Sequence, residues 1–342
     1  MSWPLALVVG LAPLVATVLG TRAVLHLLRR RNIVDNPNER SSHAAPTPRG
    51  GGIAVIAVLV GAWTILWATG HGFAGGAMFW LVIGGAAVLA AVSWVDDVRG
   101  GLPAAPRFLI QMAAVAAGLF ALPADGAILQ GAVPLWADRL IAGLLWLWFI
   151  NLFNFMDGID GITGCKTGTI GIGIFVVGLT AGTAAPLALP GLAAAGVAVG
   201  FLVWNWAPAK VFLGDVGSVP LGHLLGWLLL MLAAMGHWDA ALLLPAYYLA
   251  DASLTLARRL ARGEKPWQAH REHAYQVAVR AGRSHAEVSL MIAAVGIALA
   301  GLTLVGLGGG AARWASLAAG IFLVALFLWY LRRQPLPSAH GD

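Results

Sequence analysis

The sequence predicts an all-α, polytopic membrane protein with about eleven transmembrane helices, because long apolar runs recur at the ~20-residue length of a spanning helix. Of its 342 residues, 59% are hydrophobic and 11% are charged, whereas a soluble domain carries about 25% charged residues. Many of the 15 tryptophans lie near the ends of the apolar runs, as in an interfacial belt. The runs are 3–28, 50–69, 76–95, 106–123, 138–153, 166–184, 187–206, 217–235, 239–257, 287–307 and 311–331. We therefore expect one integral membrane domain over residues 1–342.

The first run predicts a retained anchor whose N-terminus lies outside, because its basic residues, 29–31, follow it. Alternation then places the C-terminus and five loops in the cytosol. All of the 21 Lys and Arg residues except Arg139 and Arg313 fall in or beside these segments. This bias explains the basic pI near 10.1 without a nucleic-acid partner. The five cytosolic loops are 29–52, 96–105, 154–165, 207–216 and 258–287.

Five aspartates lie at the cytosolic ends of the runs. They are Asp96, Asp97, Asp157, Asp160 and Asp215. An ion or solute pathway would place polar groups near the bilayer midplane, where few are visible. The arrangement predicts an active site at the membrane surface and leaves a transporter as an alternative.

The first loop combines prolines with Gly50–Gly52, so tightly turned backbone N–H groups can approach an anion. Arg40, His43 and Arg49 are our candidates for phosphate binding. The alternative is a basic segment that contacts lipid headgroups.

The adjacent Asp96 and Asp97 repel each other unless a cation lies between them, and hard oxygen ligands suit Mg²⁺. The fourth loop adds a further carboxylate, Asp215, on the same side of the membrane. The alternatives are a solvated acidic helix end for the pair and a helix cap by Asp215 or Ser218.

Asn151, Asn154, Asp157 and Asp160 follow an i, i+3 series, which on a helix forms one stripe. Helix packing would explain the interleaved glycines but not these polar groups. We expect the stripe to bind substrate.

The fifth loop is the longest and most basic, and it contains His270, Arg271 and His273. Two histidines at i, i+3 are a weak metal signal without cysteine. Binding of a phosphate or a sugar nucleotide fits better, and an amphipathic surface helix is the alternative.

In the ninth run, Pro245 predicts a bend that could open a groove for a lipid chain or serve only packing. We expect Asp251 to pair with Arg258 or another base. Cys165 is interpreted as a small packing residue.

Together these motifs resemble the polyprenyl-phosphate N-acetylhexosamine-1-phosphate transferase family, which includes peptidoglycan translocase I and the enzymes that initiate O-antigen and teichoic-acid linkage units. The resemblance runs through all five loops, residues 33–276, and includes the eleven-span topology of the GlcNAc-type branch. Its most specific parts are Pro46–Gly52, Asp96-Asp97, Asn154–Gly161 and Phe212–Ser218.

The resemblance implies that Asp215 binds Mg²⁺, or alternatively Mn²⁺, with help from Asp96 or Asp97. One of that pair would orient or deprotonate the lipid phosphate. Asn154, Asp157 and Asp160 would shape the nucleotide-sugar site, and Arg271 with His270 or His273 would contact the sugar and diphosphate. Translocase I has a run of histidines here. The sequence His270-Arg271-Glu272-His273 therefore favours UDP-GlcNAc or a related UDP-N-acetylated deoxyhexose over a MurNAc-pentapeptide donor.

The expected reaction transfers N-acetylhexosamine 1-phosphate from a UDP-sugar to a polyprenyl phosphate such as undecaprenyl phosphate, at the cytosolic face of a bacterial inner membrane. A phosphate monoester has a second pKa of about 6, so direct attack on the β-phosphorus needs little help from a base. A CDP-alcohol-type phosphotransferase is an alternative, disfavoured because these carboxylates are spread over three distant loops. A homodimer stays open.

Overall fold

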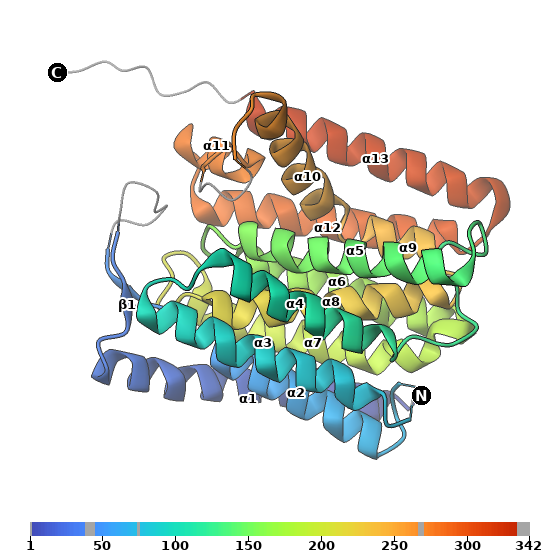
Figure 1. Ribbon diagram of the computed structural model, residues 1–342, viewed down its shortest axis with the longest axis horizontal. Coiled ribbons are helices and arrows are strands. Elements are labelled where there is room, and N and C mark those ends of the chain that lie inside the picture. Colours follow the sequence, from blue (N-terminus) through green and yellow to red (C-terminus); the bar gives the residue numbers. More distant parts are fainter. Residues whose placement is uncertain (1, 38–44, 74–75, 266–269, 334–342) are drawn as a thin grey trace.

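The computed structural model describes residues 2–37, 45–73, 76–265 and 270–333, and these are mostly helical (Figure 1). A short antiparallel pair, β1 with β2, is the one sheet among them. The elements are α1 (Trp3–Arg30), β1 (Val34–Asp35), β2 (Thr47–Pro48), α2 (Gly52–Ala68), α3 (Phe79–Arg99), α4 (Ala104–Leu119), α5 (Leu135–Phe155), α6 (Ile162–Thr180), η1 (Gly182–Ala184), α7 (Ala185–Asn205), α8 (Asp215–Ala234), α9 (Trp238–Leu243), α10 (Ala246–Ala261), α11 (Ala274–Arg280), α12 (His285–Gly306) and α13 (Gly310–Arg332).

Eight helical segments of the described chain are long and apolar enough to cross a membrane: α1, α3, α5, α6, η1 with α7, α8, α12 and α13. Helices α2 and α4 are also apolar but shorter, with 17 and 16 residues. The ninth apolar run forms two helices, α9 and α10, which are separated at Leu244 and Pro245. The expectation of a polytopic all-α membrane protein is therefore confirmed, and the predicted bend at Pro245 is a break between two helices.

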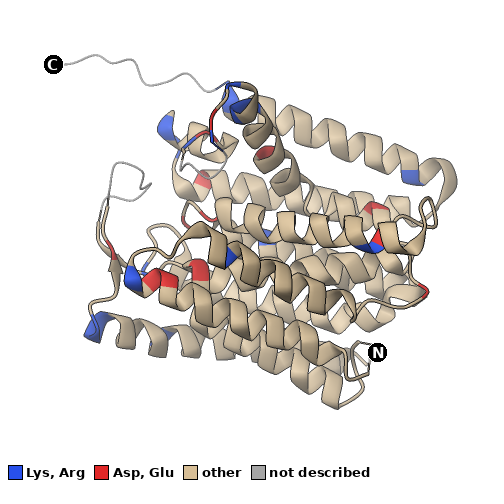
Figure 2. Cartoon of the chain, in the orientation of Figure 1, with Lys and Arg blue, Asp and Glu red and all other residues tan. Residues whose placement is uncertain are grey.

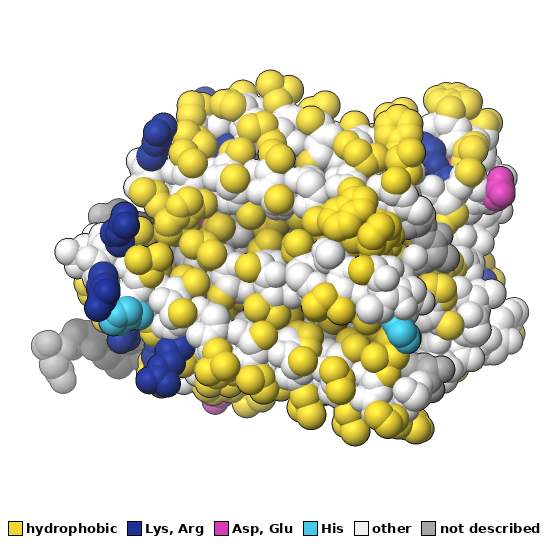
Figure 3. Space-filling model, turned by 90° about the horizontal axis from the view of Figure 1, so that it is seen from below, with side chains coloured by type: hydrophobic (Ala, Val, Ile, Leu, Met, Phe, Trp, Pro, Cys, Tyr) yellow, Lys and Arg dark blue, Asp and Glu magenta, His cyan; other side chains and the backbone are white. Residues whose placement is uncertain are grey.

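Helix α8 is the centre of the bundle. The apolar membrane-spanning stretch of α8 is completely buried, and the helix packs against α2, α3 and α5. Close approach to α2 depends on glycine, because a Cβ on Gly52 would lie 2.3 Å from the Cα of Gly217. Small residues allow such packing in lipid. The outer helices instead present hydrophobic side chains over the lateral face (Figure 3), as a surface that meets lipid requires.

Charged residues gather mainly at one end of the bundle, opposite the N-terminus (Figure 2). The C-terminal ends of α1, α3, α5, α7 and α10 lie at this end (Figure 1). The described parts of the five loops singled out from the sequence therefore share one end of the protein. Arg139 and Arg313 lie toward the other end, as expected.

Candidate active site

The loop before α2 is hydrogen-bonded along its backbone to the loop before α8. The N–H of Phe212 donates to the carbonyl of Pro48 at 2.8 Å, and the N–H groups of Gly50 and Gly51 donate to the carbonyl of Phe212 at 3.1 and 2.9 Å. Gly50 has a φ of +124°, which favours glycine. This pairing places Arg49 beside the start of α8.

Three carboxylates and two arginines meet at that point and form what we call the Asp–Arg cluster: Asp96 and Asp97 from α3, Asp215 from α8, Arg107 from α4, and Arg49. Arg49 Nη2 lies 2.8 Å from Asp215 Oδ1 and 2.9 Å from Asp97 Oδ1. Arg107 Nη1 pairs with Asp96 and lies 3.4 Å from Asp215 Oδ2. The arginines separate carboxylates that would otherwise repel one another.

Asp97, a residue of α3, caps the N-terminus of helix α8. Its Oδ1 accepts the backbone N–H of Asp215 at 3.2 Å, and its Oδ2 accepts that of Val216 at 3.0 Å. A carboxylate at this position also interacts favourably with the helix dipole. Gly214 makes the contact feasible, since its φ is +76° and a Cβ there would lie 2.7 Å from Asp97 Oδ2. The cap is thus supplied by Asp97, and Asp215 keeps its carboxylate for other partners.

Asp215 is the most accessible carboxylate of the cluster. Its side chain is 16% exposed, against 7% for Asp96 and 1% for Asp97. Asp96 also accepts the backbone N–H of Leu102. Burial lowers the pKa of Arg49. The negative charges of Asp215, Asp97 and Asp35 outweigh the effect of burial and raise this pKa above its ordinary value. The surface open to a ligand is therefore formed by Asp215 and two charged guanidinium groups.

The predicted polar stripe is divided by the end of α5 at Phe155. Asn154 and Asn151 lie on the helix: Asn154 Oδ1 accepts the hydroxyl of Ser218 at 2.5 Å, and Asn151 Nδ2 donates to Gln111 at 2.8 Å. The expectation of one continuous helical stripe is wrong beyond that point, because residues 156–161 form a loop.

Asp157 lies in this loop and accepts the hydroxyl of Thr163 at 2.6 Å. Burial raises the pKa of Asp157 to about 7, against the lowering effect of that hydrogen bond, and the charge of Asp215 raises it further. The negative charge of Asp215 in the Asp–Arg cluster therefore acts on the Asp157 carboxyl group.

Asp160 connects three segments. Its Oδ2 accepts the N–H of Ala209 at 3.1 Å and lies 3.3 Å from His285 Nδ1, while its carbonyl accepts the hydroxyl of Ser289 at 2.8 Å. These contacts hold the 156–161 loop against α12 and the loop after α7.

The fifth loop reaches the end of α5 through aromatic contacts. The ring of His273 stacks on that of Tyr275 at 5.8 Å, and the Tyr275 hydroxyl donates to the carbonyl of Phe155 at 3.1 Å. Burial lowers the pKa of His273 and lowers that of His270 to about 4, so both rings are uncharged at neutral pH. Arg271 is therefore the cationic residue of this motif.

Asp251 anchors the same loop from α10. Its carboxylate accepts the N–H of Ala274 at 2.8 and 2.9 Å and pairs with Arg332 Nη2 at 3.3 Å. The expected basic partner is thus Arg332, not Arg258. Arg40 and His43 fall outside the described residues and stay predictions.

Arg107 is the cluster residue that the sequence reasoning missed. The available signal was local, since it is the one charged residue of the run 106–123. Its pairing with two aspartates of other helices is visible only in the fold.

The cluster has the chemistry of a magnesium site but not a complete ligand set. In the described part of the chain, no three His, Cys, Asp or Glu side chains are arranged to hold a metal ion. Arg49 and Arg107 lie among the three carboxylates. Mg²⁺ commonly uses one or two carboxylates and completes its shell with water and substrate phosphates. Asp215 fits that mode of binding.

Comparison with known proteins identifies the family of the chain. Residues 79–233 match the profile of the family described as Glycosyl transferase family 4. The chain is 30% identical over 321 residues to the decaprenyl-phosphate N-acetylglucosaminephosphotransferase of Mycobacterium tuberculosis, covering 83% of this chain and 78% of that protein.

The same enzyme of Mycolicibacterium smegmatis is 31% identical over 324 residues, with 83% and 78% covered. The phospho-N-acetylmuramoyl-pentapeptide-transferase of Frankia casuarinae is 32% identical over 262 residues, which cover 63% of this chain and 73% of that protein. The chain therefore belongs to glycosyl transferase family 4, among the polyprenyl-phosphate hexosamine-1-phosphate transferases.

Proposed function

We propose that this protein transfers N-acetylhexosamine 1-phosphate from a UDP-sugar to a polyprenyl phosphate, giving a polyprenyl-diphosphate sugar and UMP. The observation that carries the proposal is the Asp–Arg cluster, which combines two partly exposed guanidinium groups with the carboxylate of Asp215 at the end of the bundle where most charged residues gather. Such a set suits phosphoryl transfer, where spread negative charge must be positioned and neutralised.

In the proposed reaction an oxygen of the acceptor phosphate forms a bond to the β-phosphorus of the UDP-sugar. The bond between the β-phosphorus and the bridging oxygen breaks, and UMP leaves with that electron pair. Arg49 and Arg107 would bind the two phosphate groups and hold them in line. Asp96 and Asp97 are almost buried and already accept hydrogen bonds, so we assign them to orienting the arginines and α8 rather than to removing a proton.

A divalent ion, Mg²⁺ or Mn²⁺, would be held by Asp215 with help from Asp96 or Asp97. When bound it would neutralise charge that develops on the diphosphate. The nucleotide-sugar would lie against the loop that carries Asp157, near Asn151 and Asn154 of α5, and Arg271 would also contact it. The neutral His270 and His273 would contact it by hydrogen bonds.

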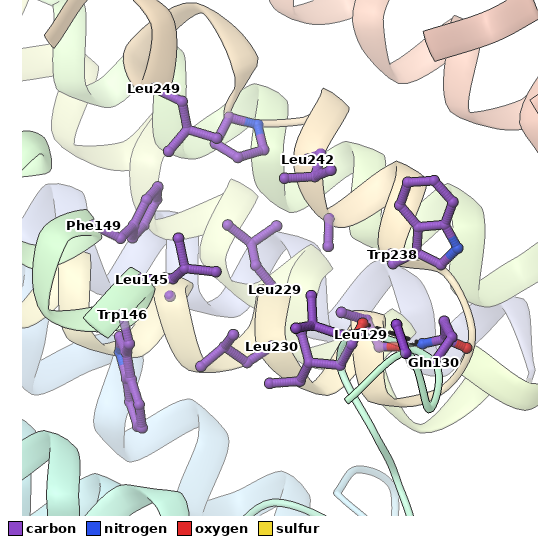
Figure 4. Close-up of a pocket in the computed structure, with 16 residues that line it drawn as sticks. Leu129, Gln130, Leu145, Trp146, Phe149, Leu229, Leu230, Trp238, Leu242 and Leu249 are labelled. Carbon is purple, nitrogen blue, oxygen red and sulfur yellow. Dashed lines mark hydrogen bonds between the residues drawn. The ribbon is translucent and has the colours of Figure 1, made fainter. Parts of the chain in front are cut away.

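An apolar pocket could hold the chain of the acceptor. A cavity of about 420 Å³ lies between α5, α8, α9, α10 and the connection before α5 (residues 128–132), and it is lined almost wholly by apolar side chains (Figure 4). Gly226, the lining residue of α8 that is nearest in sequence to Asp215, follows it by eleven residues, which is about 16 Å along a helix axis. A polyprenyl phosphate could thus place its phosphate at the cluster and a later part of its chain in this pocket.

We further propose eleven crossings with the cluster on the cytosolic side of a bacterial inner membrane, as the distribution of Lys and Arg favours. A UDP-GlcNAc-type donor is favoured over a MurNAc-pentapeptide, and the product would start a cell-envelope glycan such as O-antigen.

The test is UMP release by the purified protein in lipid nanodiscs with polyprenyl phosphate, Mg²⁺ and a panel of UDP-sugars, with the mass of the lipid product measured alongside. We expect UMP with at least one UDP-N-acetylhexosamine, none without the lipid phosphate, loss of UMP with EDTA, and recovery with Mg²⁺ or Mn²⁺. Asp215→Asn should be inactive but folded, whereas the exposed Asp125→Asn should match wild type. Absence of UMP with every UDP-N-acetylhexosamine from folded protein would refute the proposal.

A further inference from the structure

Lys166 is a lysine buried completely within the membrane-spanning helix α6. Its Nζ donates a hydrogen bond to the backbone carbonyl of Leu244 at 2.5 Å and lies 5.9 Å from the ring centroid of Tyr248, within the range of a cation–π contact. Lys166 forms no ion pair with another residue of the described part of the chain. Because burying an ammonium group in a membrane is costly, such a residue needs a stated role.

One partner of Lys166, Leu244, lies in the break between α9 and α10, and the other, Tyr248, lies in the first turn of α10. Pro245 has no N–H, so it removes a hydrogen bond of a continuous helix, and its ring obstructs the preceding turn. The last carbonyls of α9 are then left without helical partners. The ammonium group of Lys166 satisfies the carbonyl of Leu244, at the residue directly before the proline.

Helix α6 also makes room for the side chain of Leu244. A Cβ on Gly173 would lie only 2.1 Å from Leu244 Cδ2. Gly173 follows Lys166 by seven residues, which places both on one face of α6. One helix therefore binds the backbone of Leu244 and receives its side chain, and we call Lys166 and Gly173 the Leu244 seat.

The elements held by this seat line the apolar pocket from both sides of the break. Leu242 comes from α9, and Pro245 and Leu249 come from the break and from α10 (Figure 4). A change in the angle between α9 and α10 would move these residues relative to α5 and α8. The shape of the pocket therefore depends on where Leu244 is held.

We propose that the Leu244 seat fixes the bend between α9 and α10 and so sets the affinity for the long apolar chain of the acceptor. This inference rests on the proposed function. Lys166 acts here as a positioning residue that contacts neither phosphate nor sugar. Its effect should appear in the KM for a long-chain polyprenyl phosphate and not in turnover.

Two variants disturb the seat in different ways. Lys166→Met keeps a long side chain but removes the donor, and Gly173→Ala puts a methyl group against Leu244. Gly168→Ala is the matched control on the same helix, because its Cβ would meet the nearest atom, in Ala198, at 3.8 Å. Lys166→Arg keeps a donor and should restore the wild-type KM.

We expect both disturbing variants to raise the KM for a C55 polyprenyl phosphate by about fivefold or more, while kcat and the KM for the UDP-sugar stay within about twofold. A C10 acceptor, too short to fill the pocket, should show no such difference, and Gly168→Ala should behave as wild type. Folding is checked by gel filtration and tryptophan fluorescence, and if Lys166→Met does not fold, Gly173→Ala decides.

An unchanged C55 KM in the folded variants, or an equal rise in both KM values, would overturn the inference while wild-type UMP release still supports the proposed function. Failure of the wild type to release UMP would instead count against the proposed function.

Discussion

Replacing Asp97 by asparagine should cost stability as well as activity, because this carboxylate caps α8. Each hydrogen bond to a charged partner contributes about 1.5–3 kcal/mol, and a buried donor left without an acceptor costs about 1–3 kcal/mol. Asp97 accepts two backbone N–H groups and pairs with Arg49, and its side chain is 1% exposed. An asparagine keeps one acceptor oxygen and turns an NH₂ group toward the second donor. The expected loss is about 3 kcal/mol, or about 6–12 °C in the melting temperature.

The assay follows thermal unfolding with a fluorogenic thiol reagent, because Cys165 is the one cysteine of the sequence and is buried. The reagent therefore reacts when α6 becomes exposed. Asp125→Asn, an exposed change of the same kind, is the control and should melt with wild type. UMP release measured in parallel should fall more than about tenfold, since α8 also carries Asp215. A melting temperature within 2 °C of wild type, by the scale of about 2–4 °C per kcal/mol, would refute the capping argument.

Three other changes test the site. Arg107→Met should lower kcat/KM by about tenfold or more with little effect on the melting temperature, because it removes a partly exposed guanidinium group from two carboxylates. The kinetics of UMP release measure this effect, and a wild-type kcat/KM would contradict the assignment. Asp157 has its pKa raised to about 7 by burial, so the folded state holds a proton that the unfolded chain releases at about pH 4. Stability should therefore fall as pH rises from about 4 to 7, and Asp157→Asn should gain melting temperature over wild type across that range; a pH-independent difference would refute this. Gly214→Ala should cost about 1–3 kcal/mol, since alanine is strained at φ +76° and meets the Asp97 carboxylate; unchanged thiol-reagent melting would contradict it.

Local patterns in the sequence were enough for the class of protein. Hydropathy over about 20 residues depends only on neighbours along the chain, so each apolar run coincides with a helix or, around Pro245, with two. The placement of aspartates at the ends of these runs likewise predicted one functional end. The motif around Asn154–Gly161 predicted the family, which the relatives confirm.

The tertiary structure decided what each polar residue contacts. The i, i+3 spacing predicted a continuous stripe, but α5 ends at Phe155. The Asp160 carboxylate instead accepts the N–H of Ala209 and lies beside His285. Such partners come from other helices and leave no local pattern.

The same holds for the groups that give the site its charge and its shape. Arg49 is 166 residues from Asp215, and Lys166 is 78 residues from Leu244. A buried charge is stabilised only by the partner that folding brings to it, whereas burial of an apolar run requires no particular partner. The sequence by itself therefore determined the membrane helices and the end of the bundle where the aspartates gather. Only the packing around α8 decided which charges neutralise one another there.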